Sequence, residues 1–252
     1  MKIILPPSET KVSGGTASSL SIEELSFPRL THLRKQVLEA VTVLAEDHPE
    51  SLRVLKLGPK QGSEVQRNRD LLTSPTMPAI ERYTGVLFDA IGVSTLSPQQ
   101  RQFLDSHVLI QSALFGIITA NDHIPAYRLS HNSSVFGRGR PLKNLWRAES
   151  AKVFDDMEGM ILDLRSGGYT TLAPLPRRDG VLSLTVVTRG SDGSLRALNH
   201  FNKRGKGEIV RSIVQLGEVF SQPQDLIAGL NGVGHEVSLL DPYTLQFITH
   251  RQ

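Results

Sequence analysis

The sequence predicts one compact domain over residues 1–252, of the α+β or irregular mixed α/β class, with helices around a central sheet. Three observations support this fold class. Segments with helical spacing and segments with strand-like spacing of apolar residues are mixed along the chain without strict alternation. The sequence contains no internal repeat, low-complexity tract or clear interdomain linker. No apolar run approaches the roughly 20 residues that a helix needs to cross a bilayer, so we expect no membrane association.

After a first strand at residues 2–5 and a polar, glycine-containing loop at 8–19, the N-terminal half is predicted to be helical. Apolar residues recur there at helical intervals, and prolines and glycines separate the segments. The clearest helix start is at Ser97, which is a good N-cap, with Pro98 at the first position and Gln100 at capping-box spacing. The expected helices cover residues 30–45, 50–57, 63–72, 79–90 and 97–106.

The C-terminal half is predicted to supply most of the sheet. Apolar, partly β-branched runs predict strands at 107–118, 161–164 and 182–187. Asp241 and Pro242 predict the turn of a hairpin between strands at 237–240 and 245–249. The remaining elements are a loop at 121–142, a helix at 145–157, a hairpin-type turn at 191–194 and a helix at 224–230.

Composition excludes several classes of site. The chain has no cysteine, which excludes disulfides, a thiolate nucleophile, thiol-based peroxide sensing and cysteine-ligated metals. The eight histidines include no i,i+4 pair, and no phosphate-binding or dinucleotide-binding glycine motif is present. We therefore expect neither a metal nor a cofactor. The N-terminal apolar segment ends at Pro6, too early for a signal peptide, which favours a cytoplasmic protein.

The most basic part of the chain lies between Arg189 and Arg211. It contains six Lys or Arg residues and two acidic residues, a local charge of +4, whereas the whole chain carries +3. Gly205 and Gly207 precede an apolar-periodic segment, so we expect them at the start of a helix. Free N–H groups and the helix dipole there favour an anion. An exposed turn with solvated charges is the alternative. The candidate phosphate-binding residues are Lys203, Arg204, Lys206 and Arg211.

Polar residues that follow two predicted strands form a candidate ligand pocket. Open α/β sheets bind ligands at the carboxyl ends of their strands. Arg128 has apolar or small neighbours, so its guanidinium should be partly buried and needs a carboxylate, a carbonyl or a ligand anion. A structural ion pair for Arg128 and a mobile surface loop for residues 8–11 are the alternatives. The candidate pocket residues are Ser8, Thr10, Lys11, Tyr83, Arg128, Ser166 and Tyr169.

Short motifs in matching order over nearly the whole chain resemble the bacterial peroxide stress protein YaaA family. Residues 4–11 look like that family's first strand and its Ser-Pro-Ala-Lys-Thr motif, and residues 201–211 are similar to its aromatic-x-Lys-Lys-x-Arg-Gly segment. Glu9 stands where the family has a lysine, with Lys11 as the candidate stand-in, and Gly168 stands where it has a glutamate; if either family residue is chemically required, this chain differs in activity. Further matches are Tyr83-Thr84-Gly85, residues 112–118, residues 125–129, Trp146 and residues 161–169.

The resemblance implies a cytoplasmic protein of hydrogen peroxide resistance, with a mixed α/β fold, a positively charged cleft and affinity for double-stranded DNA. It also implies a helix–hairpin–helix element. The candidate here is the pair of helices at 50–57 and 63–72 with the turn at 58–62, which carries Lys60. Such a hairpin presents N–H groups and cations to phosphates. Two ordinary surface helices joined by a proline turn are the alternative.

A separate candidate is the sequence Arg138-Gly139-Arg140-Pro141, which is identical to the core of an AT-hook. The arginines of that motif enter a narrow minor groove from an extended, free segment. Here the four residues lie in a predicted loop of a folded domain. A loop with incidental cations that touch phosphate is the alternative.

Two functional hypotheses from different classes follow. The first is a stress protein that binds double-stranded or structured DNA through phosphate contacts, without sequence specificity. Its contacts would be Lys203, Arg204, Lys206, Arg211, Lys60, Arg138 and Arg140. The second is an enzyme that acts on a nucleobase, a nucleotide or a damaged DNA base in the candidate pocket, with Glu9 as the candidate general base. In both, the ligand carries phosphate or a nucleobase.

Overall fold

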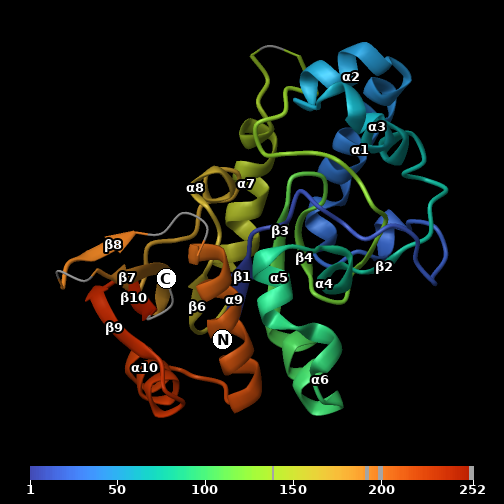
Figure 1. Ribbon diagram of the computed structural model, residues 1–252. Coiled ribbons are helices and arrows are strands. Elements are labelled where there is room, and N and C mark those ends of the chain that lie inside the picture. The colour runs from blue at the N-terminus through green and yellow to red at the C-terminus, as the bar shows by residue number, and fades with distance from the viewer. Residues whose placement is uncertain (138, 191–192, 198–200, 250–252) are drawn as a thin grey trace.

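A mixed β-sheet forms the centre of the protein. The computed structural model describes residues 1–137, 139–190, 193–197 and 201–249 (Figure 1). Within these ranges one sheet of eight strands has the order β4-β3-β1-β6-β7-β10-β9, with β8 paired to β7. The strands are β1 (Lys2–Leu5), β3 (Val108–Ser112), β4 (Gly116–Thr119), β6 (Ile161–Asp163), β7 (Val181–Arg189), β8 (Leu195–Ala197), β9 (Glu236–Asp241) and β10 (Thr244–Thr249).

The five central strands β3, β1, β6, β7 and β10 are mutually parallel, and antiparallel strands close both edges. After β1 the chain builds β3 and β4 on one side of it, and then returns to place β6 on the other side. The sheet order therefore reverses between β1 and β6. In open α/β sheets this reversal opens a crevice at the carboxyl ends of the two strands, where ligands bind.

Helices surround the sheet, as expected. Figure 1 shows α1, α2 and α3 together at one end of the molecule, whereas α5 and α9 lie side by side along the sheet. The helices are α1 (Thr31–Glu46), α2 (His48–Val54), α3 (Gly62–Arg69), α4 (Ala79–Arg82), α5 (Val86–Ile91), α6 (Pro98–His107), α7 (Leu142–Asp155), α8 (Gly167–Thr170), α9 (Phe201–Leu216) and α10 (Pro223–Gly232). Short 3-10 turns cover Ile22–Glu24, Pro28–Leu30, Pro59–Gln61 and Val93–Thr95, and β2 (Met77–Pro78) pairs with β5 (His123–Ile124).

The predicted fold class is confirmed, and so are several elements. The first strand has the predicted bounds, and the capping box at Ser97 forms: its hydroxyl accepts from the Gln100 amide at 3.3 Å, and the Gln100 side chain accepts from the Ser97 amide at 2.9 Å. The C-terminal hairpin of β9 and β10 also forms. The predicted turn at 191–194 falls partly on residues 191 and 192, which lie outside the described residues.

Two predicted elements are wrong because the chain turns within them. The helix expected at 79–90 is interrupted after α4, where Tyr83 is extended and Gly85 has a φ of 101°. The strand expected at 107–118 is the hairpin of β3 and β4. Its turn is held by the Ser112 hydroxyl, which accepts from the Leu114 amide at 3.1 Å and from the Phe115 amide at 2.9 Å. Gly116 has a φ of 68° there, conformational freedom that an apolar pattern does not reveal.

The predicted position of the two glycines in the basic segment is also wrong. Helix α9 begins at Phe201, so Gly205 and Gly207 lie inside the helix and not at its start. A Cβ at Gly207 would lie 2.3 Å from the Leu87 carbonyl oxygen in α5, and one at Gly205 would lie 2.8 Å from a methyl group of Val186 in β7. These glycines therefore let α9 approach α5 and the sheet closely, which is the physical reason for their presence.

Candidate functional site

A cavity of about 840 Å³ opens at the point where the sheet order reverses, and we call it the switch-point cavity. The loop after β1, the loop after β6, the start of α5, the first turns of α9 and the middle of β7 surround it. Its volume lies within the range of about 300–1,000 Å³ that small-molecule sites occupy. Polar residues that line it are Ser8, Glu9, Thr10, Thr84, Ser130, His131, Arg165, Ser166, Tyr169, Ser183, Thr185, Asn202, Lys203 and Lys206.

The loop after β1 forms one wall of the cavity. Its Ser8 and Thr10 hydroxyls lie 3.1 Å apart, and the Thr10 hydroxyl donates to the Thr84 carbonyl at 3.3 Å. Gly85 follows directly, and a Cβ there would lie 3.4 Å from the Ser8 hydroxyl. The close packing of the two loops thus brings the predicted pocket residues Ser8 and Thr10 beside the start of α5.

Glu9 and Arg128 form an ion pair at this wall. Arg128 Nη2 donates to Glu9 Oε2 at 2.9 Å, and the Ser130 hydroxyl donates to Glu9 Oε1 at 3.0 Å. Partial burial raises the pKa of Glu9, but these hydrogen bonds and the positive charge of Arg128 lower it more, so the pKa lies below its ordinary value. Both carboxylate oxygens already have donors, which fits a partner that holds Arg128 better than a general base. The buried guanidinium thus has the carboxylate that its sequence context requires.

Lys11 lies beneath the same loop and does not line the cavity. Its ammonium donates to the Ser8 carbonyl at 2.9 Å and lies 4.1 Å from the centre of the Tyr127 ring. The side chain is buried, and burial lowers the pKa of Lys11 to about 7, with the charge of Arg128 acting in the same direction. Lys11 therefore supports the loop from below.

Tyr83 likewise belongs to the floor of the site. It is buried, and its hydroxyl lies 2.7 Å from that of Tyr127, which in turn lies 2.7 Å from the Ser112 hydroxyl. Burial raises the pKa of both tyrosines. The structure thus places Tyr83 in a closed hydrogen-bond chain behind the cavity, instead of at the ligand.

A buried ion pair stiffens the loop after β6. Arg165 Nε and Nη2 each donate to the Asp163 carboxylate at 2.8 Å, and Arg165 Nη1 donates to the Ala173 carbonyl at 2.8 Å. The Arg165 side chain is fully buried. This pair holds the chain where it leaves β6 and leads to Ser166 and Tyr169, two predicted pocket residues that do line the cavity.

The four cations predicted in the basic segment separate into two groups on α9. Lys203 and Lys206 line the switch-point cavity. Lys206 is half-buried and donates to the Leu164 carbonyl at 3.0 Å; burial lowers its pKa, which the Asp163 carboxylate opposes. Lys203 is exposed and has no hydrogen bond or ion pair to another described residue.

The other two cations have partners away from the cavity. Arg204 pairs with Glu208 at 3.0 Å on the exposed side of α9. Arg211 Nη1 donates to the Ile91 carbonyl at 2.7 Å and to the Thr95 hydroxyl at 3.0 Å, which satisfies the C-terminal end of α5. These two arginines do not join the site.

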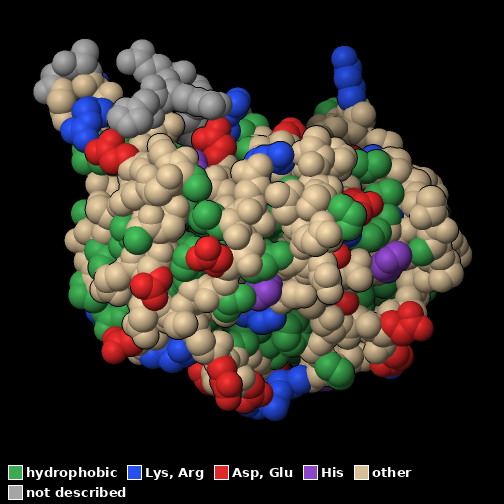
Figure 2. Space-filling model, turned by 90° about the horizontal axis from the view of Figure 1, so that it is seen from below, with side chains coloured by type: hydrophobic (Ala, Val, Ile, Leu, Met, Phe, Trp, Pro, Cys, Tyr) green, Lys and Arg blue, Asp and Glu red, His purple; other side chains and the backbone are tan. Residues whose placement is uncertain are grey.

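The remaining predicted phosphate contacts also lie elsewhere. Lys60 is exposed in the turn between α2 and α3, at the end of the molecule opposite α9 in Figure 1. Helices α2 and α3 and the turn between them cover the segment of the predicted helix–hairpin–helix element, but that element and its binding to DNA stay predictions. Arg140 is exposed and packs on the Phe136 ring at 5.5 Å, and Arg138 lies outside the described residues. Figure 2 shows that, on the face seen from below, basic side chains are scattered among acidic ones.

His131 is a cavity residue that the sequence did not indicate. Its ring packs edge-to-face with Tyr169 at 5.1 Å, and a Cβ on Gly168 would lie 2.3 Å from its Nε2 atom. A side chain at Gly168, where the resembled family has a glutamate, therefore requires His131 to move. Burial lowers the pKa of His131, and Lys56 acts in the same direction, so the ring is neutral at pH 7. The sequence does not predict this role, because residues 130 and 131 lie in a long polar loop without a motif.

The comparisons with known proteins agree with the sequence motifs. A family model described as peroxide stress protein YaaA matches residues 1–229. The chain belongs to this family of peroxide stress proteins. A UPF0246 protein of Corynebacterium glutamicum is 38% identical over 237 residues, which is 93% of each chain. A UPF0246 protein of Streptomyces coelicolor is 36% identical over 246 residues, covering 96% of this chain and 94% of the relative. An uncharacterized protein of Campylobacter jejuni is 28% identical over 235 residues, covering 91% and 90%.

Two findings concern groups that the described residues do not form. No helix in the described ranges has the length and apolar character needed to cross a membrane. Among the same residues, no three His, Asp or Glu side chains gather as a group that could hold a metal ion.

Proposed function

We propose that this YaaA family protein contributes to peroxide resistance by binding DNA without sequence specificity, with a nucleotide unit in the switch-point cavity. The observation that carries the proposal is the pair Lys203 and Lys206, one turn apart on α9, at a cavity lined with hydroxyl groups at the topological switch point. Lysine is a common ligand of phosphate, and neutral hydroxyls suit the polar edges of a sugar or a base.

Unused hydrogen-bonding capacity supports the same proposal. Lys203 has no partner among the described residues, and the Asn202 side-chain oxygen is buried there without a donor. An unpaired buried polar atom costs about 1–3 kcal/mol, so a ligand that supplies its partner gains affinity. Both residues lie in the first turn of α9, beside the cavity.

The proposal differs from binding by a continuous basic face. Arg204 and Arg211 already have protein partners, so we expect the phosphate contacts of the basic segment to come from Lys203 and Lys206. The α2–α3 hairpin would add a second, independent contact to long DNA through Lys60. Short ligands would then report on the cavity, and long duplexes on both surfaces.

The test is DNA binding by fluorescence anisotropy across a salt series, with duplex and bubble-containing DNA. We expect Lys203→Ala to weaken binding and to reduce the slope of log affinity against log salt by about 1. Arg204→Ala is the matched control, because it removes one cation from the same turn of the same helix on the exposed side. Equal losses in the two variants would contradict the proposal and favour a diffuse basic surface.

A second candidate function is chemistry on the seated nucleobase, favoured by the neutral His131 ring at the cavity wall. A neutral imidazole can accept a proton near pH 7, whereas Glu9 has both oxygens bound. Incubation of DNA with the protein, followed by mass spectrometry of the released bases and nucleosides, tests for a product. His131→Gln should abolish product formation and keep DNA affinity; the absence of any product with the unmodified protein would reject this candidate.

A further inference from the structure

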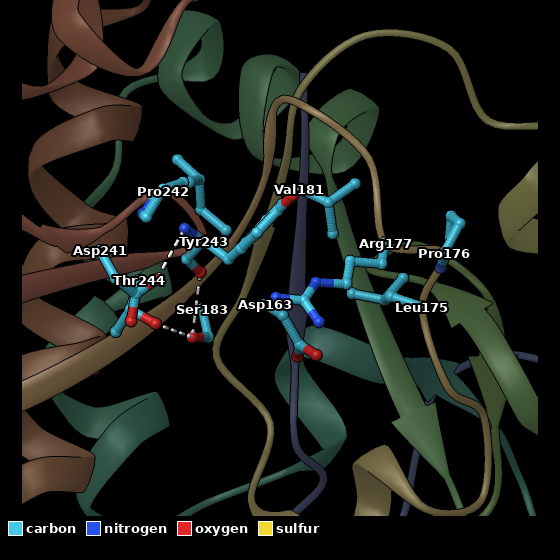
Figure 3. A pocket seen from close by; sticks show the side chains of 11 residues that line it. Asp163, Leu175, Pro176, Arg177, Val181, Ser183, Asp241, Pro242, Tyr243 and Thr244 are labelled. Carbon is cyan, nitrogen blue, oxygen red and sulfur yellow. Dashed lines mark hydrogen bonds between the residues drawn. The ribbon is translucent and has the colours of Figure 1, made fainter.

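A second hollow borders the switch-point cavity. It is a groove of about 560 Å³ between the segment that leads into β7 and the turn from β9 to β10 (Figure 3). Ser183 lines both the groove and the cavity, so the two hollows adjoin at this residue of β7. The groove takes part of its lining from Tyr243, which lies beyond residues 1–229 that the family model matches.

The Arg177 guanidinium lies over the Tyr243 ring in this groove (Figure 3), 4.7 Å from the centre of the ring. Arg177 is exposed and has no ion pair with a described residue, and the Tyr243 hydroxyl has no hydrogen bond to one. A phenol ring and a planar guanidinium are the two surfaces on which proteins most often stack unpaired bases. Apolar side chains around them, including Leu175 and Val181, exclude water from such a stack.

The backbone holds this aromatic turn in place. The Tyr243 amide donates to the Asp241 carboxylate at 2.8 Å, and the Tyr243 carbonyl accepts from the Ser183 amide at 2.8 Å (Figure 3). Asp163 also borders the groove, but its carboxylate is bound by Arg165. A fixed ring, a cation without an ion pair to a described residue and a neutralised carboxylate thus suit a planar ligand that carries a phosphate.

We infer that the groove holds the base of the nucleotide next to the one in the switch-point cavity, stacked against Tyr243 and Arg177. This inference rests on the proposed function and narrows its substrate class to strands with at least two consecutive unpaired nucleotides. Each hollow is large enough for one group of small-molecule size, and Ser183 lines both. A mononucleotide fills only the cavity, whereas a dinucleotide spans both.

Titration calorimetry with thymidine 5′-phosphate and with the 5′-phosphorylated dithymidine dinucleotide tests this inference. We expect the dinucleotide to bind about tenfold tighter than the mononucleotide, the lower part of the range for one stacked base. Tyr243→Leu, which keeps bulk without a ring, should abolish this ratio and leave mononucleotide affinity unchanged. Tyr243→Phe should keep the ratio, and Arg177→Gln should reduce it. Lys35→Ala, an exposed cation on α1, is the charge-matched control.

The outcomes separate the two proposals. Equal affinities for the two ligands, or an unchanged ratio in Tyr243→Leu, would overturn the role of the groove and leave the cavity proposal intact. Loss of mononucleotide binding in Lys203→Ala supports the cavity independently of Tyr243. Failure of both ligands to bind the unmodified protein would overturn both proposals.

Discussion

The floor and the mouth of the switch-point cavity are both rich in polar residues, but they differ in how those residues are used. In the floor, the groups of Lys11, Tyr83 and Arg165 are buried and bound by other protein groups. The mouth is the part of the lining that includes Lys203 and His131. There Lys203 is exposed without a partner among the described residues, and burial lowers the pKa of His131, which favours its neutral ring. A polar residue's partners, more than its presence near a pocket, thus separate support of the fold from contact with a ligand.

We therefore expect substitutions in the floor to lower the stability of the fold, and substitutions at the mouth to lower the affinity for a ligand. The largest loss of stability is expected for Asp163→Asn, which leaves the fully buried Arg165 without its carboxylate partner. Removal of one member of such a pair costs about 3–5 kcal/mol. Urea denaturation measures this directly. The control is Glu23→Gln, which breaks the exposed pair with Lys35 and should cost less than about 1 kcal/mol. Equal losses of stability in the two variants would mean that the buried pair contributes no more to the fold than the exposed pair.

The next largest effect is expected for Gly207→Ala, because the added Cβ would meet the backbone of α5 at 2.3 Å. Overpacking of this kind costs about 1–3 kcal/mol. Gly232→Ala on α10 is the matched control, since a Cβ there meets no atom within 4 Å. If Gly207→Ala instead kept its stability and lost anion binding, the glycines would belong to the site after all.

Lys11 gives an effect on stability that depends on pH. Its pKa falls from about 10.5 in the unfolded chain to about 7 in the fold, so between these values the unfolded state binds more protons. The free energy of unfolding should therefore rise with pH in this window, by up to about 1.4 kcal/mol per pH unit, and should not depend on the titration of Lys11 below it. Urea unfolding between pH 7 and 9 should show this slope in the unmodified protein and its absence in Lys11→Met. Parallel curves would mean that Lys11 is solvated.

The smallest change in stability is expected for Lys203→Ala. An exposed residue without a partner should change the free energy of unfolding by less than about 0.5 kcal/mol. Its nucleotide affinity should nevertheless fall about tenfold, the value of one charge-assisted phosphate contact of roughly 1.5 kcal/mol. Thermal unfolding with and without thymidine 5′-phosphate measures both quantities in one series. A destabilised Lys203→Ala variant with unchanged affinity would reverse the assignment of floor and mouth.

Local sequence patterns predict the elements that depend on interactions between residues close together in the sequence. The first strand and the capping box at Ser97 follow from a β-branched apolar run and from hydrogen bonds within one turn. The glycines of α9 were misassigned because their role depends on Leu87 and Val186, which are remote in sequence. No local pattern distinguishes a glycine that opens a helix from one that lets two elements touch.

The site was predicted in part for the same reason. Ser8 and Ser166 were predictable because each follows a predicted strand, and parallel strands bring their carboxyl ends to one edge of the sheet. His131 lies in a loop whose path is set by tertiary contacts, such as the two hydrogen bonds between Asn68 and the Arg128 backbone, both 2.8 Å long. The division of the basic segment also needed the fold, because only the helix places Lys203 and Arg204 on different sides.

The most direct test of the account is a crystal structure of the protein soaked with thymidine 5′-phosphate, in which the distance from the phosphate to each cation is measured. We expect a phosphate oxygen within about 3 Å of the Lys203 ammonium, inside the switch-point cavity. A phosphate bound instead by Arg204 or by Lys60 in the α2–α3 hairpin, with the cavity filled by solvent, would contradict it.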